Sequence, residues 1–174
     1  MIISLVGLPG SGKSTVGRQL ARRLQLPFVD SDQRIEARLG CTIRDYFDRE
    51  GEDRFRDMEQ LTIDELTTDA RGVLSTGGGV VLREANRAHL HDRSQVVYLK
   101  SSPEELIHRL RHDTNRPLLQ VADPLARLRE LYAVRDPLYR SVAHFVIETG
   151  RPSVATLANM IVMQLELAGV LPST

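Results

Sequence analysis

The chain has 174 residues but only one cysteine, Cys41, and only two lysines, Lys13 and Lys100. A single cysteine excludes an internal disulfide and a metal site built from several thiolates. The net charge is zero, so no overall positive field favours nucleic acid or an acidic membrane. No apolar run reaches the roughly eighteen residues of a membrane span, and no basic segment precedes the first apolar run as in a signal peptide. We therefore expect a cytoplasmic protein without a membrane or nucleic-acid partner.

Repeats and low-complexity segments are also lacking, and the length suits one domain. Apolar residues make up 41% of the chain and charged residues 26%, as in ordinary globular proteins. Apart from the two lysines, the basic residues are arginines. Arginine suits two-pronged binding of carboxylate and phosphate, although a GC-rich genome would also enrich it.

Short apolar runs alternate with helical patterns along the chain, which predicts a doubly wound α/β fold with a parallel sheet covered on both faces. Helical periodicity follows the first strand over Lys13–Leu24, a second helix begins at Ser102-Pro103, and Ser153 caps a last one. The predicted strands are Ile2–Val6, Pro27–Val29, Gly72–Ser75, Gln95–Leu99 and His144–Ile147. Two segments are predicted to lie outside the sheet and the helices that cover it: a charged helical insertion at about 33–66 and a mixed segment at about 111–123. The second has the composition of a mobile lid or of an ordinary loop.

The segment GLPGSGKST (7–15) follows the first predicted strand and precedes a helix. It matches the phosphate-binding loop pattern G-x-x-x-x-G-K-[ST], whose backbone N–H groups surround an anion at the start of the helix. Lys13 would reach the β- and γ-phosphates, and the Ser14 hydroxyl would bind Mg²⁺. A glycine-rich turn that binds nothing is the alternative. The sequence thus predicts a nucleoside triphosphate site.

Phosphate-loop proteins usually take a magnesium-binding aspartate from the end of another strand, but the strand at Val73-Leu74 is followed by STGGG (75–79). The carboxylate is therefore expected from DSD (30–32), at the end of the second strand. Because alternate residues of an extended chain face the same way, Asp30 and Asp32 could both face the phosphate loop. Asp30 would then hold Mg²⁺ through water, and Asp32 could accept a proton from a substrate hydroxyl. Either aspartate could instead only cap a helix.

Three consecutive glycines, Gly77, Gly78 and Gly79, come directly after the third predicted strand. They leave bare backbone N–H groups that a ligand can approach closely, which favours a small-molecule pocket over a simple turn. On a helix, Glu52, Arg56 and Glu59 would share one face. Such a charged face is often only solvated, so its spacing alone decides nothing.

Six segments together resemble the bacterial shikimate kinases over nearly the whole chain: GLPGSGKST (7–15), DSD (30–32), GEDRFRDME (51–59), STGGG (75–79), RPLL (116–119) and RDPLY (135–139). The resemblance implies a three-layer fold with a five-stranded sheet in the order 2-3-1-4-5. It also implies a single kinase domain over 1–174, with a substrate-binding subdomain at about 31–61 and a lid at about 111–122. The implied activity is transfer of the γ-phosphate of ATP, with Mg²⁺, to the 3-hydroxyl of shikimate by a monomeric enzyme.

The resemblance also implies roles for individual residues. Asp32 would position or deprotonate the acceptor hydroxyl, Arg56 and Arg135 would bind the shikimate carboxylate, and the glycines at 77–79 would offer backbone N–H groups. Arg116 would act on the transferring phosphate with Lys13, while Arg109 and Arg151-Pro152 would enclose the adenine. The full set expected to bind the nucleotide is Gly10, Ser11, Gly12, Lys13, Ser14, Thr15, Arg109, Arg116, Arg151 and Pro152, with Ser14 and Asp30 toward the metal.

Two other functions remain open from the residues. A kinase of the same fold could act on gluconate or on a nucleoside monophosphate, and gluconate would also need arginines for its carboxylate. A nucleotide-dependent switch without turnover would need no residue such as Asp32 beside an acceptor pocket.

Overall fold

The computed structural model describes residues 1–68, 71–110, 121–150 and 152–172. Five strands form one parallel sheet in the order β2-β3-β1-β4-β5, as predicted. They are β1 (Ile2–Val6), β2 (Phe28–Asp30), β3 (Gly72–Ser75), β4 (Gln95–Lys100) and β5 (Phe145–Glu148). Strands β2 and β5 each begin and end one residue later than predicted, and β4 extends one residue further, to Lys100.

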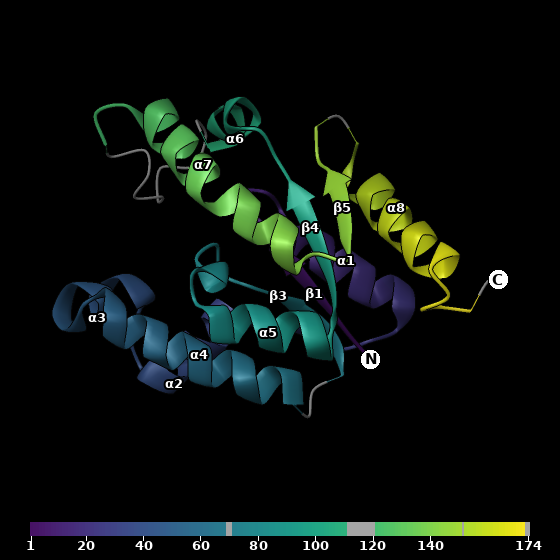
Figure 1. Cartoon of the computed structure of the whole chain (residues 1–174), viewed down its shortest axis with the longest axis horizontal. Coiled ribbons are helices and arrows are strands. Elements are labelled where there is room, and N and C mark those ends of the chain that lie inside the picture. The colour runs from purple at the N-terminus through teal and green to yellow at the C-terminus, as the bar shows by residue number, and fades with distance from the viewer. Residues whose placement is uncertain (69–70, 111–120, 151, 173–174) are drawn as a thin grey trace.

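Helices cover both faces of the sheet and make three layers (Figure 1). The described helices are α1 (Lys13–Leu24), α2 (Ser31–Leu39), α3 (Ile43–Glu50), α4 (Glu52–Thr68), the short η1 (Val80–Leu82), α5 (Glu84–Arg93), α6 (Pro103–Leu110), α7 (Pro124–Val142) and α8 (Val154–Leu167). Helices α1 and α8 bury one face through Leu20 and Ile161, among others. Helices α4 to α7 bury the other through residues such as Ile63, Leu90 and Tyr139. No helix of the described chain is long and apolar enough to cross a membrane.

The strand register brings three strand ends to one place. Ser75 of β3 pairs with Leu5 of β1 on one side and with Asp30 of β2 on the other. The chain leaves β1 toward β2 and later crosses to β4 on the opposite side, so the order of strands reverses at β1. Ligands of open α/β sheets bind at such reversals, beyond the carboxyl ends of the strands. The ends of β1, β2 and β3 therefore define where a site should be sought.

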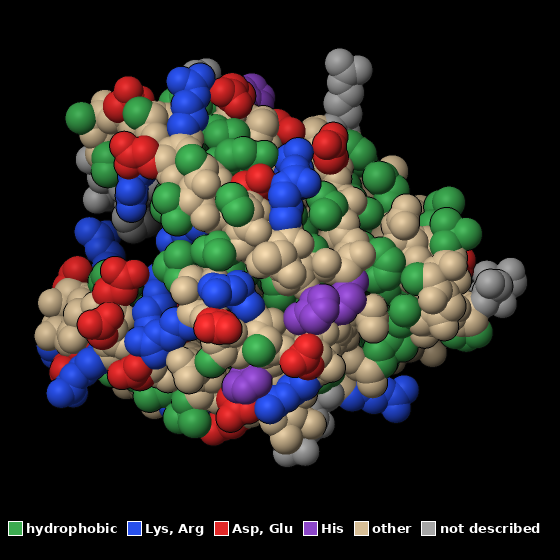
Figure 2. Space-filling model, viewed as in Figure 1, with side chains coloured by type: hydrophobic (Ala, Val, Ile, Leu, Met, Phe, Trp, Pro, Cys, Tyr) green, Lys and Arg blue, Asp and Glu red, His purple; other side chains and the backbone are tan. Residues whose placement is uncertain are grey.

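Helices α2, α3 and α4 fill the predicted insertion between β2 and β3 and project beside the sheet (Figure 1). Their caps explain where each one starts and stops. Thr42 accepts a hydrogen bond from the Asp45 N–H at the start of α3, and Gly40 ends α2 with a φ of 72°, which favours glycine. Figure 2 shows the molecular surface hollowed between these helices and the N-terminal part of α7.

Candidate active site

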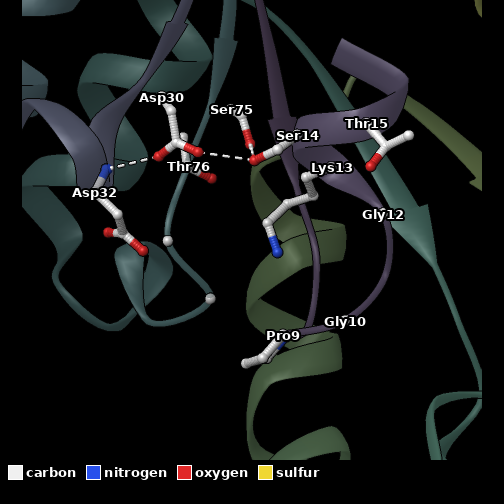
Figure 3. Close-up of a pocket in the computed structure, with 12 residues that line it drawn as sticks. Pro9, Gly10, Gly12, Lys13, Ser14, Thr15, Asp30, Asp32, Ser75 and Thr76 are labelled. Carbon is white, nitrogen blue, oxygen red and sulfur yellow. Dashed lines mark hydrogen bonds between the residues drawn. The ribbon is translucent and has the colours of Figure 1, made fainter. Parts of the chain in front are cut away.

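The loop between β1 and α1 is shaped for an anion. Gly12 caps α1 with a φ of 91° and offers no capping side chain, so the first N–H groups of α1 remain available to a ligand. The buried Lys13 ammonium donates to the carbonyl oxygens of Gly7 (2.7 Å) and Leu8 (3.0 Å), which holds it inside the loop. Figure 3 shows Lys13 reaching into the same space as Asp32. The geometry agrees with the phosphate-binding loop that the sequence predicts.

Ser14 and Asp30 meet beside Lys13. The Ser14 hydroxyl donates to Asp30 Oδ2 at 2.8 Å and lies 3.2 Å from Ser75 Oγ (Figure 3). Two hydroxyls and a carboxylate are hard oxygen donors of the kind that Mg²⁺ prefers. These residues therefore fit a magnesium ion next to the phosphate loop.

Asp30 caps a helix, which is one of the two alternatives that the sequence left open, and its role toward magnesium stays a prediction. Its Oδ1 accepts the N–H groups of Asp32 (2.9 Å) and Gln33 (3.3 Å) and so caps α2. Its Oδ2 is directed to Ser14 instead. One carboxylate thus fixes the start of α2 and at the same time faces Ser14, where a magnesium ion would fit.

Asp32 lies near Asp30 for a different reason from the predicted one. The argument from alternate residues of an extended strand is wrong, because α2 begins at Ser31 and Asp32 is in its first turn. The turn still directs Asp32 toward Lys13 (Figure 3). Burial, and then the charge of Asp30, raise the pKa of Asp32 to about 6, against the opposing effect of Lys13. A carboxylate with a pKa near neutrality suits proton transfer better than an ordinary aspartate.

Two cavities meet at Asp32. The larger, about 440 Å³, is lined by the phosphate loop, Asp30 and the Ser75-Thr76 segment. The smaller, about 190 Å³, lies among Phe47, Phe55 and Arg56 of the helical insertion. Asp32, Gly77 and Gly78 line both cavities. A nucleotide and a second small molecule would therefore share one wall.

Arg56 is held in the smaller cavity by acidic neighbours on its own helix. Its Nη1 lies 2.9 Å from Glu59 Oε1, and its Nε lies 3.5 Å from Glu52 Oε1. Glu59 is 1% exposed, and this burial raises its pKa although Arg56 opposes the shift. Of the charged face predicted for α4, Arg56 and Glu59 are thus turned inward, while Glu52 stays exposed to solvent.

Each glycine of the 77–79 segment lies against a different side chain. A methyl group on Gly77 would meet Asp32 Oδ1 at 2.7 Å, and one on Gly78 would meet Pro9 Cδ at 2.8 Å. One on Gly79 would overlap the Arg56 guanidinium. The glycines are therefore required by the protein's own side chains, in addition to any ligand that approaches the backbone.

Arg135 reaches the same segment from α7. Its Nη1 lies 3.3 Å from the position that a methyl group on Gly78 would take, and its charge acts on the pKa of Glu59. The predicted pair Arg56 and Arg135 therefore both approach the 77–79 segment. Two guanidinium groups beside a small cavity can bind one carboxylate.

Arg109 links the phosphate loop to the segment after β5. It donates to the Ser11 carbonyl (3.3 Å) and to the Thr149 carbonyl (3.0 Å). Pro152, the other predicted adenine neighbour, is partly buried three residues beyond Thr149. Arg116, Arg151 and most of the predicted lid lie outside the described residues.

Three contributors to the site were missed by the sequence analysis. The sequence could have indicated Ser75 as a site residue, because it stands at the end of a predicted strand and closely precedes the glycine run. In the sequence, Pro9 is indistinguishable from any other variable residue of the phosphate loop, because its contact with Gly78 depends on the tertiary structure. Tyr139 is completely buried, and its apolar ring resembles any core residue in the sequence.

A nucleotide site that shares a wall with an acceptor cavity is the arrangement that direct phosphoryl transfer needs, because water must be kept from the donor. The fold and the site together define a kinase of the phosphate-loop class that acts on a small molecule. A family model described as shikimate kinase matches residues 9–166.

Similar proteins identify the family within this class of kinases. The shikimate kinase of Ralstonia nicotianae is 60% identical over 97% of this chain and 88% of that protein. That of Paracidovorax citrulli is 61% identical over 98% of this chain and 94% of that protein. The solved shikimate kinase from Acinetobacter baumannii in complex with shikimate is 47% identical and covers 98% of this chain and 94% of its own, with a TM-score of 0.90. The chain belongs to the shikimate kinase family.

Proposed function

We propose that this chain transfers the γ-phosphoryl group of ATP to the 3-hydroxyl of shikimate and produces shikimate 3-phosphate and ADP. The observation that carries this proposal is the position of Asp32, which lines both the cavity of the phosphate loop and the cavity of Arg56. A hydroxyl held there lies between a phosphate donor and a group that can orient it or accept its proton.

The proposal assigns the larger cavity to ATP. The N–H groups at the start of α1 and the Lys13 ammonium bind and neutralise the phosphates, and Ser14 and Asp30 hold Mg²⁺, Asp30 through water. The metal, when bound, supplies positive charge for the developing negative charge of the transferring group. Arg109 and Pro152 are placed at the adenine. Arg116 and Arg151, outside the described residues, keep the roles that the family resemblance gives them.

The smaller cavity is assigned to shikimate, which offers one carboxylate and three hydroxyls. Arg56 and Arg135 bind the carboxylate, Asp32 the acceptor hydroxyl, and the N–H groups of the 77–79 segment the remaining oxygens. The helices at about 31–61 act in this proposal as the substrate-binding subdomain. Two guanidinium groups and one partly buried carboxylate support the assignment, because the guanidinium groups match the substrate carboxylate and Asp32 can accept a hydrogen bond from the acceptor hydroxyl.

We also propose that the enzyme acts as a cytoplasmic monomer without a nucleic-acid partner. One chain supplies both cavities and the wall between them, so the site needs no second copy. Light scattering during gel filtration tests this part: a mass near the 19.5 kDa of one chain is expected, and a stable dimer would contradict it.

The central test measures ADP release from Mg·ATP in a coupled assay with shikimate, gluconate, AMP or no acceptor. We expect stimulation by shikimate alone. Stimulation by gluconate or AMP instead would assign the same fold to another acceptor. Tight ATP binding without stimulation by any acceptor would favour a nucleotide-dependent switch.

A further inference from the structure

The hydroxyl of Tyr139 makes a short hydrogen bond to the segment that lines both cavities. Tyr139 lies in α7 with no exposed surface, and its hydroxyl donates to the Gly78 carbonyl oxygen at 2.5 Å. The Arg135 guanidinium, one helical turn earlier, interacts with the same hydroxyl. A single buried phenol therefore joins the glycine segment to Arg135, one of the two arginines proposed to bind the substrate carboxylate.

The Gly78 carbonyl determines where the next N–H group is directed. A trans peptide is planar, so the carbonyl of Gly78 and the N–H of Gly79 point in opposite directions. Glycine restricts its backbone less than any other residue, so these dihedral angles need an external constraint. No described residue accepts a backbone hydrogen bond from the Gly79 N–H, whereas the N–H of Val80 bonds to Gly77. The Gly79 N–H is thus left for a ligand.

We propose that Tyr139 is a positioning residue for the acceptor: its hydroxyl fixes the Gly78–Gly79 peptide so that the Gly79 N–H is presented to the cavity beside Asp32 and Arg56. This inference rests on the proposed function. Burial raises the pKa of Tyr139, so the phenol stays protonated and donates over the whole working range of pH.

Tyr98 separates this role from the ordinary need of a buried phenol for a partner. The rings of Tyr98 and Tyr139 pack 5.0 Å apart, and both side chains are almost completely buried. The Tyr98 hydroxyl donates to Asp136 Oδ1 at 2.7 Å, away from the glycine segment. Removing either hydroxyl takes the donor from a partly buried acceptor, but only the Gly78 carbonyl belongs to the cavity wall.

The test compares Tyr139→Phe with Tyr98→Phe in the full-length chain. We expect both variants to lower the melting temperature to a similar extent. Only Tyr139→Phe should raise the KM for shikimate, by about three- to tenfold, which is the weight of one ordinary hydrogen bond. The KM for ATP should change less than twofold in both. Replacement of Tyr139 by 4-aminophenylalanine, which keeps a donor at the same place, should restore most of the shikimate affinity.

Nuclear magnetic resonance reports on the peptide itself without any turnover. In Tyr139→Phe the carbonyl carbon of Gly78 and the amide nitrogen of Gly79 should shift, and in Tyr98→Phe they should not. Unchanged shifts, an unchanged shikimate KM, or equal rises of KM in both variants would each overturn the inference. If the wild-type chain does not phosphorylate shikimate, the proposed function fails, while the shifts still decide whether Tyr139 holds the peptide.

Discussion

The Arg56 guanidinium lies so close to the α-carbon of Gly79 that a methyl group there would come within 3.0 Å of three of its atoms. Gly79 does not have a positive φ, so its requirement for glycine comes from this contact and not from backbone strain. The glycine segment and Arg56, the arginine proposed to bind the substrate carboxylate, are thus fitted to each other before any ligand arrives.

Gly79→Ala should displace Arg56 and raise the KM for shikimate by about tenfold or more, since a charged hydrogen bond contributes ~1.5–3 kcal/mol. Gly77→Ala is the matched comparison, because its methyl group would meet Asp32 and not Arg56. We expect that variant to lower kcat more than it changes KM. Steady-state kinetics with varied shikimate at saturating ATP separate the two effects. The same changes of KM and kcat in both variants would argue against separate roles for the two contacts, Gly79 with Arg56 and Gly77 with Asp32.

Asp32→Asn should reduce turnover by at least about a hundredfold, the usual contribution of a positioned acid or base, while ATP still binds. The variant should also gain stability at pH 8. The pKa of Asp32 is raised from 3.8 to about 6, so above pH 6 the ionised group costs the fold roughly 2–4 kcal/mol. Urea unfolding at pH 8 and at pH 5 tests this, because the gain should shrink at the lower pH. Near wild-type turnover of Asp32→Asn would show that Asp32 neither positions nor deprotonates the acceptor hydroxyl.

The pH dependence of kcat/KM for shikimate should follow the same group. Asp32 is protonated below its raised pKa, so activity should fall as pH decreases through about 6, approaching tenfold per unit below it. An ordinary aspartate would lose activity about two units lower. A profile that stays flat from pH 7.5 to 5 would contradict an ionised Asp32 in the active form.

Asp30→Asn should separate the two tasks of Asp30. Asparagine caps helices as well as aspartate does, so α2 and the melting temperature should be preserved. The charge toward Ser14 is lost, and the magnesium concentration for half-maximal activity should rise about tenfold, as for the loss of ~1–2 kcal/mol. Asp30→Ala serves as the control that loses both cap and charge. Equal magnesium dependence of wild type and Asp30→Asn would exclude Asp30 from the metal site.

Acid should destabilise the fold through His144. Its Nδ1 accepts a hydrogen bond from the Val96 N–H at 2.9 Å and so carries no proton. Its ring stacks on the ring of His91, with the two ring centroids 4.3 Å apart. Desolvation, and then the charge of His91, lower the pKa of His144. Because the unfolded chain takes up this proton first, the contribution of His144 to stability should fall as pH decreases below about 6.5.

His144→Asn keeps an acceptor for Val96 but cannot titrate. Thermal unfolding between pH 8 and pH 5 should therefore show a smaller drop in melting temperature than in wild type. His108→Asn, on the exposed side of α6, is the comparison and should leave the drop unchanged. If His144→Asn shows the same drop in melting temperature as wild type, His144 does not contribute to the loss of stability in acid.

How far the sequence predicted the site depended on whether each part is contiguous in the chain. The phosphate loop is a local motif, and the strand before it and the helix that begins at Lys13 lie where the sequence predicts them. The sheet order came from the family resemblance and is confirmed. Asp32 was identified through an incorrect strand argument, because helix α2 starts at Ser31, earlier than the hydrophobic pattern indicates.

Residues such as Tyr139 and Pro9 could not be predicted, since their function depends on contacts between segments far apart in the chain. A buried tyrosine has the same sequence pattern whether its hydroxyl bonds to Asp136, as Tyr98 does, or to the Gly78 carbonyl. Only the packing of α7 on the glycine segment distinguishes the two cases.

The wall between the two cavities is made largely of glycine backbone, and this limits how the enzyme could escape an inhibitor. A side-chain substitution can narrow a space lined by Gly77 and Gly78, but it cannot enlarge it. A compound that extends from the phosphate loop past Asp32 into the smaller cavity would press mainly on main-chain atoms. Among the charged side chains of the smaller cavity, resistance could arise at Arg56, whose charge the proposed function also needs for the substrate.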